Sequence, residues 1–485
     1  IFLQKEKVNN LKIKDVFISI FSVISVAIYP GLFLLFSNIE EAYLVDILPI
    51  SGLFILISIC LLLITFLFFR ELNKASILTS LILLLILNFA LIEKIIIRVL
   101  PMLYYWHILM VIFTIIIILA LIIKTKLSSE IAKNIRLVIL IVFGVLIIIN
   151  GLSAIPGFLE KNAKANINNP AGFEIGSVEN SSNVYYFIFD EYGGHENLLR
   201  YTGYDNESFY DALEDLGFNI SKSSRNYTAD TYIELPNLLN LALVNNASMS
   251  YETMKKGLQN PVLFRLFKES GYQLNVISDY GHIPIDSSID YSFETEMYED
   301  TLENFLIKNT FYYPFLLDQY RNSRIVEVES IFKYVSEAWK IQPERLFTFA
   351  YIEFPHLPWV VDEFGKNIPL REKSNWQNSD TYLGQLKYCS KRILEVMEII
   401  VDNDPNAIII IQSDHGYRQP IYLKNWYGKN YDDWELEYQY IRNILNAVYY
   451  KGERIDIESL SGINTLYTVI NKHFDMSFDF MEQPD

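Results

Sequence analysis

The first 160 residues contain five long apolar runs without a charged side chain, and no other feature constrains the fold as strongly. The runs cover residues 16–39, 47–69, 75–92, 99–123 and 137–159. A helix needs roughly 20 apolar residues to cross the hydrocarbon core of a bilayer. Four runs meet this length, whereas the third is marginal. One run alone could be a buried core helix, but five in series predict a five-span transmembrane domain over residues 1–159.

The positively charged residues of this region are distributed unequally between the two sides that five spans define. One side comprises the amino-terminal tail and the loops 70–74 and 124–136, with ten Lys and Arg residues: Lys5, Lys7, Lys12, Lys14, Arg70, Lys74, Lys124, Lys126, Lys133 and Arg136. The opposite loops carry Lys94 and Arg98. Cytoplasmic loops are enriched in Lys and Arg. We therefore expect a multi-pass protein of the plasma membrane whose chain beyond residue 160 is extracytoplasmic.

The charge balance changes sign along the chain. Residues 1–150 hold 12 Lys and Arg against 8 Asp and Glu, whereas the remainder holds 28 against 49. Phosphate binding requires an excess of basic residues, so the acidic part argues against nucleic acid as a partner. The aromatic content of 15% excludes a disordered chain. Two cysteines, Cys60 and Cys389, are too few for a disulfide scaffold or a Cys-rich zinc site.

After a polar linker at residues 160–183, short apolar runs alternate with amphipathic stretches. Strands are expected at residues 184–189, 274–277, 347–352 and 407–412. Helices are expected at residues 208–216, 261–270, 326–339 and 388–401. Buried strands separated by helices predict an α/β sheet covered on both faces, that is, an α/β/α sandwich. We expect this domain to extend over residues 184–485.

Acidic residues and histidines directly follow three of the predicted strands. Asp190 and Glu191 follow the first strand, His356 follows the third, and Asp414 and His415 follow the fourth. Ligands of such sheets collect at the carboxyl ends of the strands, so these side chains can converge. We expect Asp190, Asp414 and His415 to bind a metal ion. An ordinary strand-to-loop turn is the alternative for each motif alone, and Glu191 could simply face solvent.

A candidate nucleophile precedes a predicted helix start near Pro236. A hydroxyl at such a position lies close to backbone N–H groups, which favour phosphate. Thr228 and Thr231 both stand just upstream, and metal coordination would make either hydroxyl a stronger nucleophile. Each could instead be a simple cap or turn residue.

Other polar residues have weaker claims to a function. Asp279 and His282, in Ser-Asp-Tyr-Gly-His, could line the cleft, but a surface loop is the preferred interpretation. Arg225 could pair with a phosphate, although a solvated side chain is the default. His195 and His473 are expected at the surface.

The order of these motifs resembles the alkaline phosphatase superfamily. Within it, the chain is similar to the membrane-bound sulfatase-like transferases: lipoteichoic acid synthases, phosphoglycerol transferases and phosphoethanolamine transferases. Those enzymes also combine five membrane helices with an external catalytic domain. The resemblance implies that Asp190, Thr231, Asp414 and His415 bind the metal. It also implies that Thr231, five residues before a proline, is the nucleophile and that His356 binds the substrate phosphate.

The resemblance further implies a reaction. The expected enzyme moves a phosphoglycerol or phosphoethanolamine head group from a phospholipid donor to a glycan or lipid acceptor of the cell envelope, through a phospho-threonine intermediate. One divalent ion, Mn, Mg or Zn, would be its cofactor. The C/S-x-P-x-R motif of true sulfatases is absent from the sequence. A hydrolase of the same fold and a catalytically inactive envelope scaffold are the alternatives.

Overall fold

A computed structural model describes residues 13–39, 44–100, 103, 105–160, 182–243, 251–295, 306–342, 344–368 and 378–484. The chain divides into two compact units, one of residues 1–164 with 298–319 and one of residues 165–297 with 320–485. Nearly all of the predicted linker at 160–183 lies outside the described residues, as do Lys5, Lys7 and Lys12.

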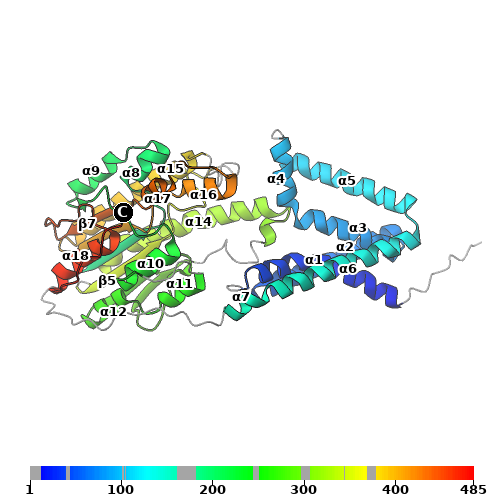
Figure 1. Ribbon diagram of the computed structural model, residues 1–485, viewed down its shortest axis with the longest axis horizontal. Helices are drawn as coiled ribbons and strands as arrows, with labels where there is room; N and C mark the ends of the chain where they lie inside the picture. The colour runs from blue at the N-terminus through cyan, green and yellow to red at the C-terminus, as the bar shows by residue number, and fades with distance from the viewer. Residues whose placement is uncertain are drawn as a thin grey trace, which may run out of the picture. The chain divides into compact units, whose positions relative to one another are not determined.

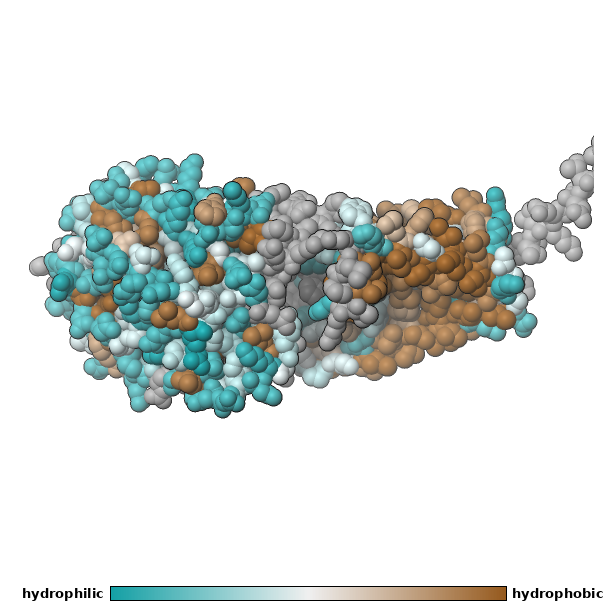
Figure 2. Space-filling model, turned by 90° about the horizontal axis from the view of Figure 1, so that it is seen from above, coloured by the Kyte–Doolittle hydropathy of each residue, from teal (hydrophilic) through white to brown (hydrophobic). Residues whose placement is uncertain are grey.

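The first unit is built from apolar helices. Four of them are long and apolar enough to span a membrane: α1 (Ile13–Ser37), α2 (Leu44–Phe69), α5 (Tyr105–Lys126) and α6 (Ser129–Ser153). A short helix, α7 (Ile155–Glu160), follows α6. Hydrophobic residues dominate the surface of these helices, whereas the visible surface of the α/β unit is mainly hydrophilic (Figure 2). By length and composition, therefore, the chain is a membrane protein.

The third predicted span, at residues 75–92, is a bent pair of helices. Helix α3 (Leu72–Leu87) ends before Asn88, and α4 (Phe89–Val99) continues at an angle of 64° to it. The described residues therefore contain five candidate membrane spans if the bent pair counts as one, and four if it is left out. The apolar run thus predicted the helix but not its break.

Two polar contacts in the first unit could not be seen from hydropathy. Arg136, expected in a loop, lies in α6 with its side chain buried, and its Nη1 donates to Ser19 Oγ over 2.7 Å. Residues 306–313, far along the chain, also belong to this unit. There Tyr313 donates its hydroxyl proton to Glu93 of α4, with the oxygens 2.5 Å apart.

The second unit contains a seven-stranded sheet in the order β2-β7-β6-β1-β5-β3-β4. Its strands are β1 (Val184–Phe189), β2 (Asn219–Ile220), β3 (Gln273–Ser278), β4 (Tyr291–Glu294), β5 (Leu346–Ile352), β6 (Ile408–Ser413) and β7 (Asn446–Tyr450). Strands β6, β1, β5, β3 and β4 run parallel, and β7 pairs antiparallel with β6 and β2. The four predicted strands form the parallel centre β6-β1-β5-β3.

Helices cover both faces of this sheet (Figure 1). On one face the core includes α8 (His195–Thr202), α9 (Glu207–Asp215), α15 (Asp380–Asn403), α16 (Gln419–Tyr427) and residues 320–336 of α14 (Tyr313–Ser336). On the other it includes α10 (Thr231–Asn240), α11 (Tyr251–Gly257), α12 (Val262–Glu269) and α18 (Gly462–Phe474). Helix α17 (Trp434–Ile441) precedes β7. The predicted α/β/α sandwich is confirmed.

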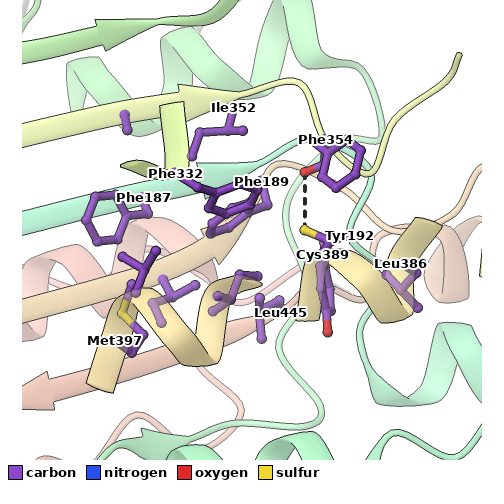
Figure 3. Packing of buried hydrophobic residues seen from close by; sticks show 14 of the residues in the cluster. Phe187, Phe189, Tyr192, Phe332, Ile352, Phe354, Leu386, Cys389, Met397 and Leu445 are labelled. Atoms are coloured by element: carbon purple, nitrogen blue, oxygen red, sulfur yellow. Dashed lines mark hydrogen bonds between the residues drawn. The ribbon is translucent and has the colours of Figure 1, made fainter. Parts of the chain in front are cut away.

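The aromatic side chains of β1 explain why this sheet is buried. Phe187 and Phe189 point into the core between β1 and the helices on one face, where Phe332 stacks on Phe189 (Figure 3). Cys389 lies in the same core, with its Sγ 3.8 Å from the carbonyl oxygen of Phe354. Strands without polar side chains on either face are typical of parallel sheets covered by helices. β1 itself therefore carries no acidic residue or histidine, and the candidate Asp190 comes directly after its last residue.

Candidate active site

Strand register places the predicted metal ligands side by side. Phe189, the last residue of β1, is level with Ser413 of β6 and with Ile352 of β5. The chain therefore leaves all three strands at the same height of the same sheet edge. Asp190 and Asp414, the first residues after β1 and β6, become neighbours for this reason.

Four predicted residues come together at this edge. The Thr231 hydroxyl donates to Asp414 Oδ2 over 2.7 Å and lies 3.1 Å from His415 Nε2. His415 Nε2 is in turn 3.4 Å from Asp190 Oδ1. One possible metal-binding atom from each of Asp190, Asp414 and His415, a carboxylate oxygen or a ring nitrogen, lies within 4.8 Å of the other two. These three side chains and that of Thr231 are buried.

Hydrogen bonds fix the orientation of the His415 ring. Its Nδ1 lies 2.9 Å from the carbonyl oxygen of Gly416, which can only accept, so the proton is on Nδ1. Burial lowers the pKa of His415 well below its ordinary value. The ring is thus neutral, and the lone pair of Nε2 faces Thr231 and Asp190. Metal-binding histidines commonly have their second nitrogen fixed in this way.

The two aspartates differ in how fully they are hydrogen-bonded. Asp414 Oδ1 accepts from the backbone N–H groups of Glu191 and His415, over 3.2 and 2.9 Å. Asp190 Oδ2 accepts from the Tyr351 hydroxyl over 2.7 Å. Asp190 Oδ1, although buried, accepts no hydrogen bond from any described residue. Buried acceptors are rarely left unsatisfied, so this oxygen is suited to a cation.

Thr231 and Thr228 occupy different environments. Thr231 is the first residue of α10, and the Asp230 side chain caps that helix by accepting from Tyr232 N over 2.9 Å. The Thr231 side chain is thereby free to face the carboxylates. Thr228 Oγ1 instead accepts from Asp230 N over 3.2 Å and lies 3.4 Å from the Tyr438 hydroxyl. The structure therefore assigns the two threonines separate roles, a cluster residue and a turn residue.

His356 lies next to this cluster, after β5. Its backbone N–H donates to the Asp190 carbonyl oxygen over 3.2 Å. Gln385, on α15, donates its side-chain amide to the carbonyl oxygens of Pro355 and His356 over 3.1 and 3.0 Å. One side chain thus holds the segment that carries the imidazole.

The His356 ring and the Arg418 guanidinium are in direct contact. Arg418 Nη2 lies 3.0 Å from His356 Nε2, a contact that requires a lone pair on that nitrogen. Burial lowers the pKa of His356, but the carboxylates of Asp190, Glu353 and Glu191 raise it overall, to about 10. These carboxylates favour a protonated ring, in conflict with the Arg418 contact. The site thus places a guanidinium and an imidazole side by side next to the carboxylates.

The sequence left the position of Glu191 open, and Arg418 was not predicted from it. Glu191, which could have faced solvent, is buried with a left-handed backbone (φ 58°), and burial raises its pKa. Its Oε1 accepts from the backbone N–H of Arg418 over 2.9 Å. Arg418 follows His415 by three residues, which was the only available signal. An Arg close to a metal-ligand motif is a reasonable candidate for phosphate or sulfate binding.

Several weaker expectations are corrected here. Asp279, His282 and His473 are buried rather than on the surface. His473 Nε2 lies 2.6 Å from the Tyr272 hydroxyl, within the core. Arg225 forms an ion pair with Glu196 instead of being solvated.

Comparison with known proteins identifies the family. The sulfatase family model matches residues 184–443, more than half of the chain. No curated protein sequence matches the chain. Similar solved structures include the C-terminal periplasmic domain of EcEptC from Escherichia coli in complex with Zn, at 12% identity and a TM-score of 0.41, covering 65% of this chain and 86% of that chain.

Two further structures have comparable scores. The C-terminal periplasmic domain of the phosphoethanolamine transferase EptC from Campylobacter jejuni has 11% identity and a TM-score of 0.38, covering 62% of this chain and 91% of that chain. The lipoteichoic acid synthase LtaP from Listeria monocytogenes has 12% identity and a TM-score of 0.38, covering 65% and 78%. The family match itself confirms the predicted resemblance: this chain belongs to the sulfatase family and is an enzyme with a sulfatase-like fold.

Proposed function

We propose that this enzyme is a metal-dependent phosphotransferase with Thr231 as its nucleophile. It would transfer a phosphoglycerol or phosphoethanolamine head group from a phospholipid to a glycan or lipid of the cell envelope. The observation that carries the proposal is the position of the Thr231 hydroxyl, 2.7 Å from Asp414 Oδ2 and 3.1 Å from His415 Nε2. A hydroxyl held between a carboxylate and an unprotonated imidazole has what an activated nucleophile requires.

Asp190, Thr231, Asp414 and His415 would hold one divalent ion. The unsatisfied Asp190 Oδ1 and the lone pair of His415 Nε2 fit this role. Three oxygen ligands and one nitrogen suit Mn or Mg and also allow Zn. When bound, the metal would lower the pKa of the hydroxyl and neutralise charge on the phosphoryl group.

The side chains of the site then have separate tasks. Thr231 Oγ1 forms a bond to the donor phosphorus while the bond from phosphorus to the diacylglycerol oxygen breaks. Asp414 Oδ2 accepts the hydroxyl proton, which ends on the diacylglycerol oxygen. Arg418 and His356 donate hydrogen bonds to the phosphoryl oxygens. In the second half an acceptor hydroxyl replaces Thr231 on phosphorus, and its proton returns to Thr231.

A membrane-anchored catalyst suits a donor that never leaves the bilayer. The Lys and Arg bias, ten residues against two, supports a cytoplasmic amino terminus and an extracytoplasmic catalytic unit in the plasma membrane. We expect a protease added to intact spheroplasts to release a fragment that begins near residue 160. Cleavage that occurs only after the membrane is broken would contradict this topology.

Mass spectrometry of the intact protein can identify the transferred group. The full-length enzyme is incubated with a mixed lipid extract containing phosphatidylglycerol and phosphatidylethanolamine, and the peptide with Thr231 is analysed. We expect a phosphoglycerol or phosphoethanolamine adduct on Thr231, and no adduct in Thr231→Ala. Thr228→Ala is the matched control and should still be labelled.

The same experiment separates the alternatives. A hydrolase would form the adduct but release the head group to water, even when acceptor glycan or lipid is present. An inactive scaffold would show neither adduct nor turnover. Faster turnover of 4-nitrophenyl sulfate than of bis(4-nitrophenyl) phosphate would contradict phosphotransfer and indicate a sulfatase.

A further inference from the structure

Another acidic residue follows a strand at the same edge of the sheet, but it is part of a buried ion pair. Asp279 comes directly after β3, and Arg324 reaches it from α14. The guanidinium donates from Nη1 to Asp279 Oδ1 and from Nη2 to Oδ2, each over 2.8 Å. Asp279 is completely buried and Arg324 is 1% exposed. The pair belongs entirely to the second unit.

This pair holds both backbone groups of one residue, Glu353. Asp279 Oδ2 accepts from the Glu353 N–H over 2.9 Å, and Arg324 Nη2 donates to the Glu353 carbonyl oxygen over 2.7 Å. Glu353 is the first residue after β5, where the regular ladder of strand hydrogen bonds ends. Side chains therefore replace the missing backbone partners and fix the direction in which the chain leaves the strand.

The backbone fixed in this way carries His356 three residues later. Glu353 Oε1 also lies 3.3 Å from His356 Nδ1, opposite the nitrogen that faces Arg418. We propose that Asp279 and Arg324 are positioning residues for His356: by clamping the Glu353 peptide, they hold the imidazole against the phosphoryl group. This inference rests on the proposed role of His356 as a donor to the substrate.

Stability alone does not explain the use of an ion pair here. Replacing a buried pair by apolar residues of similar volume is often neutral or stabilising, because desolvation costs as much as the attraction gains. The bidentate geometry offers directional contacts instead. A Lys at position 324 would keep the charge but could not serve both Asp279 oxygens and the Glu353 carbonyl oxygen in one plane.

Kinetics of Arg324→Lys and His356→Ala, alone and combined, test the proposal. Hydrolysis of bis(4-nitrophenyl) phosphate is assayed with the full-length protein in detergent, and metal content and thermal midpoint are measured in parallel. We expect Arg324→Lys to lower kcat about tenfold with its metal retained, since small misplacements near the chemistry are costly. In the His356→Ala background, the same substitution should change kcat by less than about twofold, because both act through one group.

Arg392→Lys is the matched control. Arg392 joins α15 to Glu329 of α14 through a contact of 3.0 Å, and among the described residues it forms no hydrogen bond or ion pair with Glu353 or His356. Its replacement should leave kcat within about twofold in either background. If Arg324→Lys does not fold, Thr295→Val replaces it. That variant removes one hydrogen bond to Asp279, of 2.5 Å, and keeps the ion pair.

The outcomes test the positioning role of Asp279 and Arg324 separately from the proposed role of His356. A full effect of Arg324→Lys in the His356→Ala background, or no effect in either background, overturns the positioning role alone. Unchanged turnover of His356→Ala itself overturns the proposed function of His356, and the positioning role with it. Non-additivity with metal retained supports both.

Discussion

The carboxyl ends of β3 and β6 carry similar residues but form different structures. β6 ends in Ser413 and continues as Asp-His-Gly, and β3 ends in Ser278 and continues as Asp-Tyr-Gly-His. At β3 the carboxylate of Asp279 receives hydrogen bonds from Arg324, Thr295 and a backbone N–H. Asp414, after β6, also accepts three hydrogen bonds, from Thr231 and from two backbone N–H groups. The difference lies at the neighbouring β1, where one oxygen of Asp190 has no donor among the described residues.

The pKa values of Asp279 and Asp414 shift in opposite directions. Burial would raise the pKa of Asp279, but Arg324, Thr295 and the backbone N–H of Glu353 hold it below its ordinary value. Burial raises the pKa of Asp414, and there the opposing contacts do not outweigh it. An acidic residue at a strand end therefore does not mark a site by itself. A buried cluster of carboxylates with too few hydrogen-bond donors indicates a cation-binding site more strongly than a single acidic residue does.

The largest expected effect separates the nucleophile from its neighbour. Thr231→Ala should lower turnover of bis(4-nitrophenyl) phosphate by about 10⁴-fold or more, since removal of a nucleophile has effects of this size in other enzymes. Thr228→Ala should change it by less than about twofold, because its hydroxyl only closes a turn. Steady-state kinetics of both variants measure this. Equal losses in the two would contradict the assignment.

The next largest effect tests the end of β3, where both carboxylate oxygens of Asp279 accept hydrogen bonds. Asp279→Ala leaves the buried guanidinium of Arg324 without its counter-charge and should destabilise the fold by about 3–5 kcal/mol. Urea unfolding of the full-length protein, followed by tryptophan fluorescence, measures the change. A loss below about 1 kcal/mol would mean that Arg324 finds another partner and that the pair is not a fixed clamp.

A smaller effect is expected from replacing His356, the proposed hydrogen-bond donor to the substrate. His356→Ala should lower turnover about 10²-fold, the usual cost of removing one hydrogen-bond donor to the developing charge. Metal content should stay unchanged, because Asp190, Asp414 and His415 remain. Comparing rate and metal content in one preparation distinguishes a substrate donor from a ligand. Loss of the metal would place His356 among the ligands instead.

The smallest predicted effect has the opposite sign to that of Asp279→Ala. In metal-stripped protein, Asp190→Asn should stabilise the fold by about 1 kcal/mol, since it removes one of several neighbouring negative charges. Its amide could also donate to His415 Nε2, which lies 3.4 Å from Asp190 Oδ1. Thermal unfolding in the presence of a chelator provides the measurement. Destabilisation would show that the carboxylate is satisfied without a metal.

The sequence predicted the features that depend on local pattern. Residues 184–189 form a strand with the expected bounds, because a run of aromatic and aliphatic residues that ends in Asp has few alternatives. The convergence of Asp190 with Asp414 also followed from topology, since adjacent parallel strands end at one edge. Pattern alone left Thr228 and Thr231 open; the family resemblance selected Thr231 by its spacing to Pro236, and this residue lies with the carboxylates.

Features that depend on tertiary contacts could not be predicted. Arg418 lies in an ordinary polar stretch, and only the folded chain brings it to 3.0 Å from His356. Asp279 had the same local signal as Asp414, and its partner Arg324 is 45 residues away. Hydropathy did not show the break at Asn88, because both halves of the bent pair are apolar. Strand β7 was missed, since its sequence, Asn-Ala-Val-Tyr-Tyr, is a short apolar run that pattern alone does not distinguish from a helical segment.

Metal content is the most direct test of the central claim, that the ends of β1 and β6 form the metal centre of this sulfatase-family enzyme. Full-length wild-type protein, Asp414→Ala, His415→Ala and Arg324→Lys are purified in parallel, equilibrated with Mn, Mg or Zn and analysed by inductively coupled plasma mass spectrometry. We predict one tightly bound divalent ion per chain in the wild type and in Arg324→Lys, and its loss from the other two variants. Full occupancy in both Asp414→Ala and His415→Ala would contradict the account.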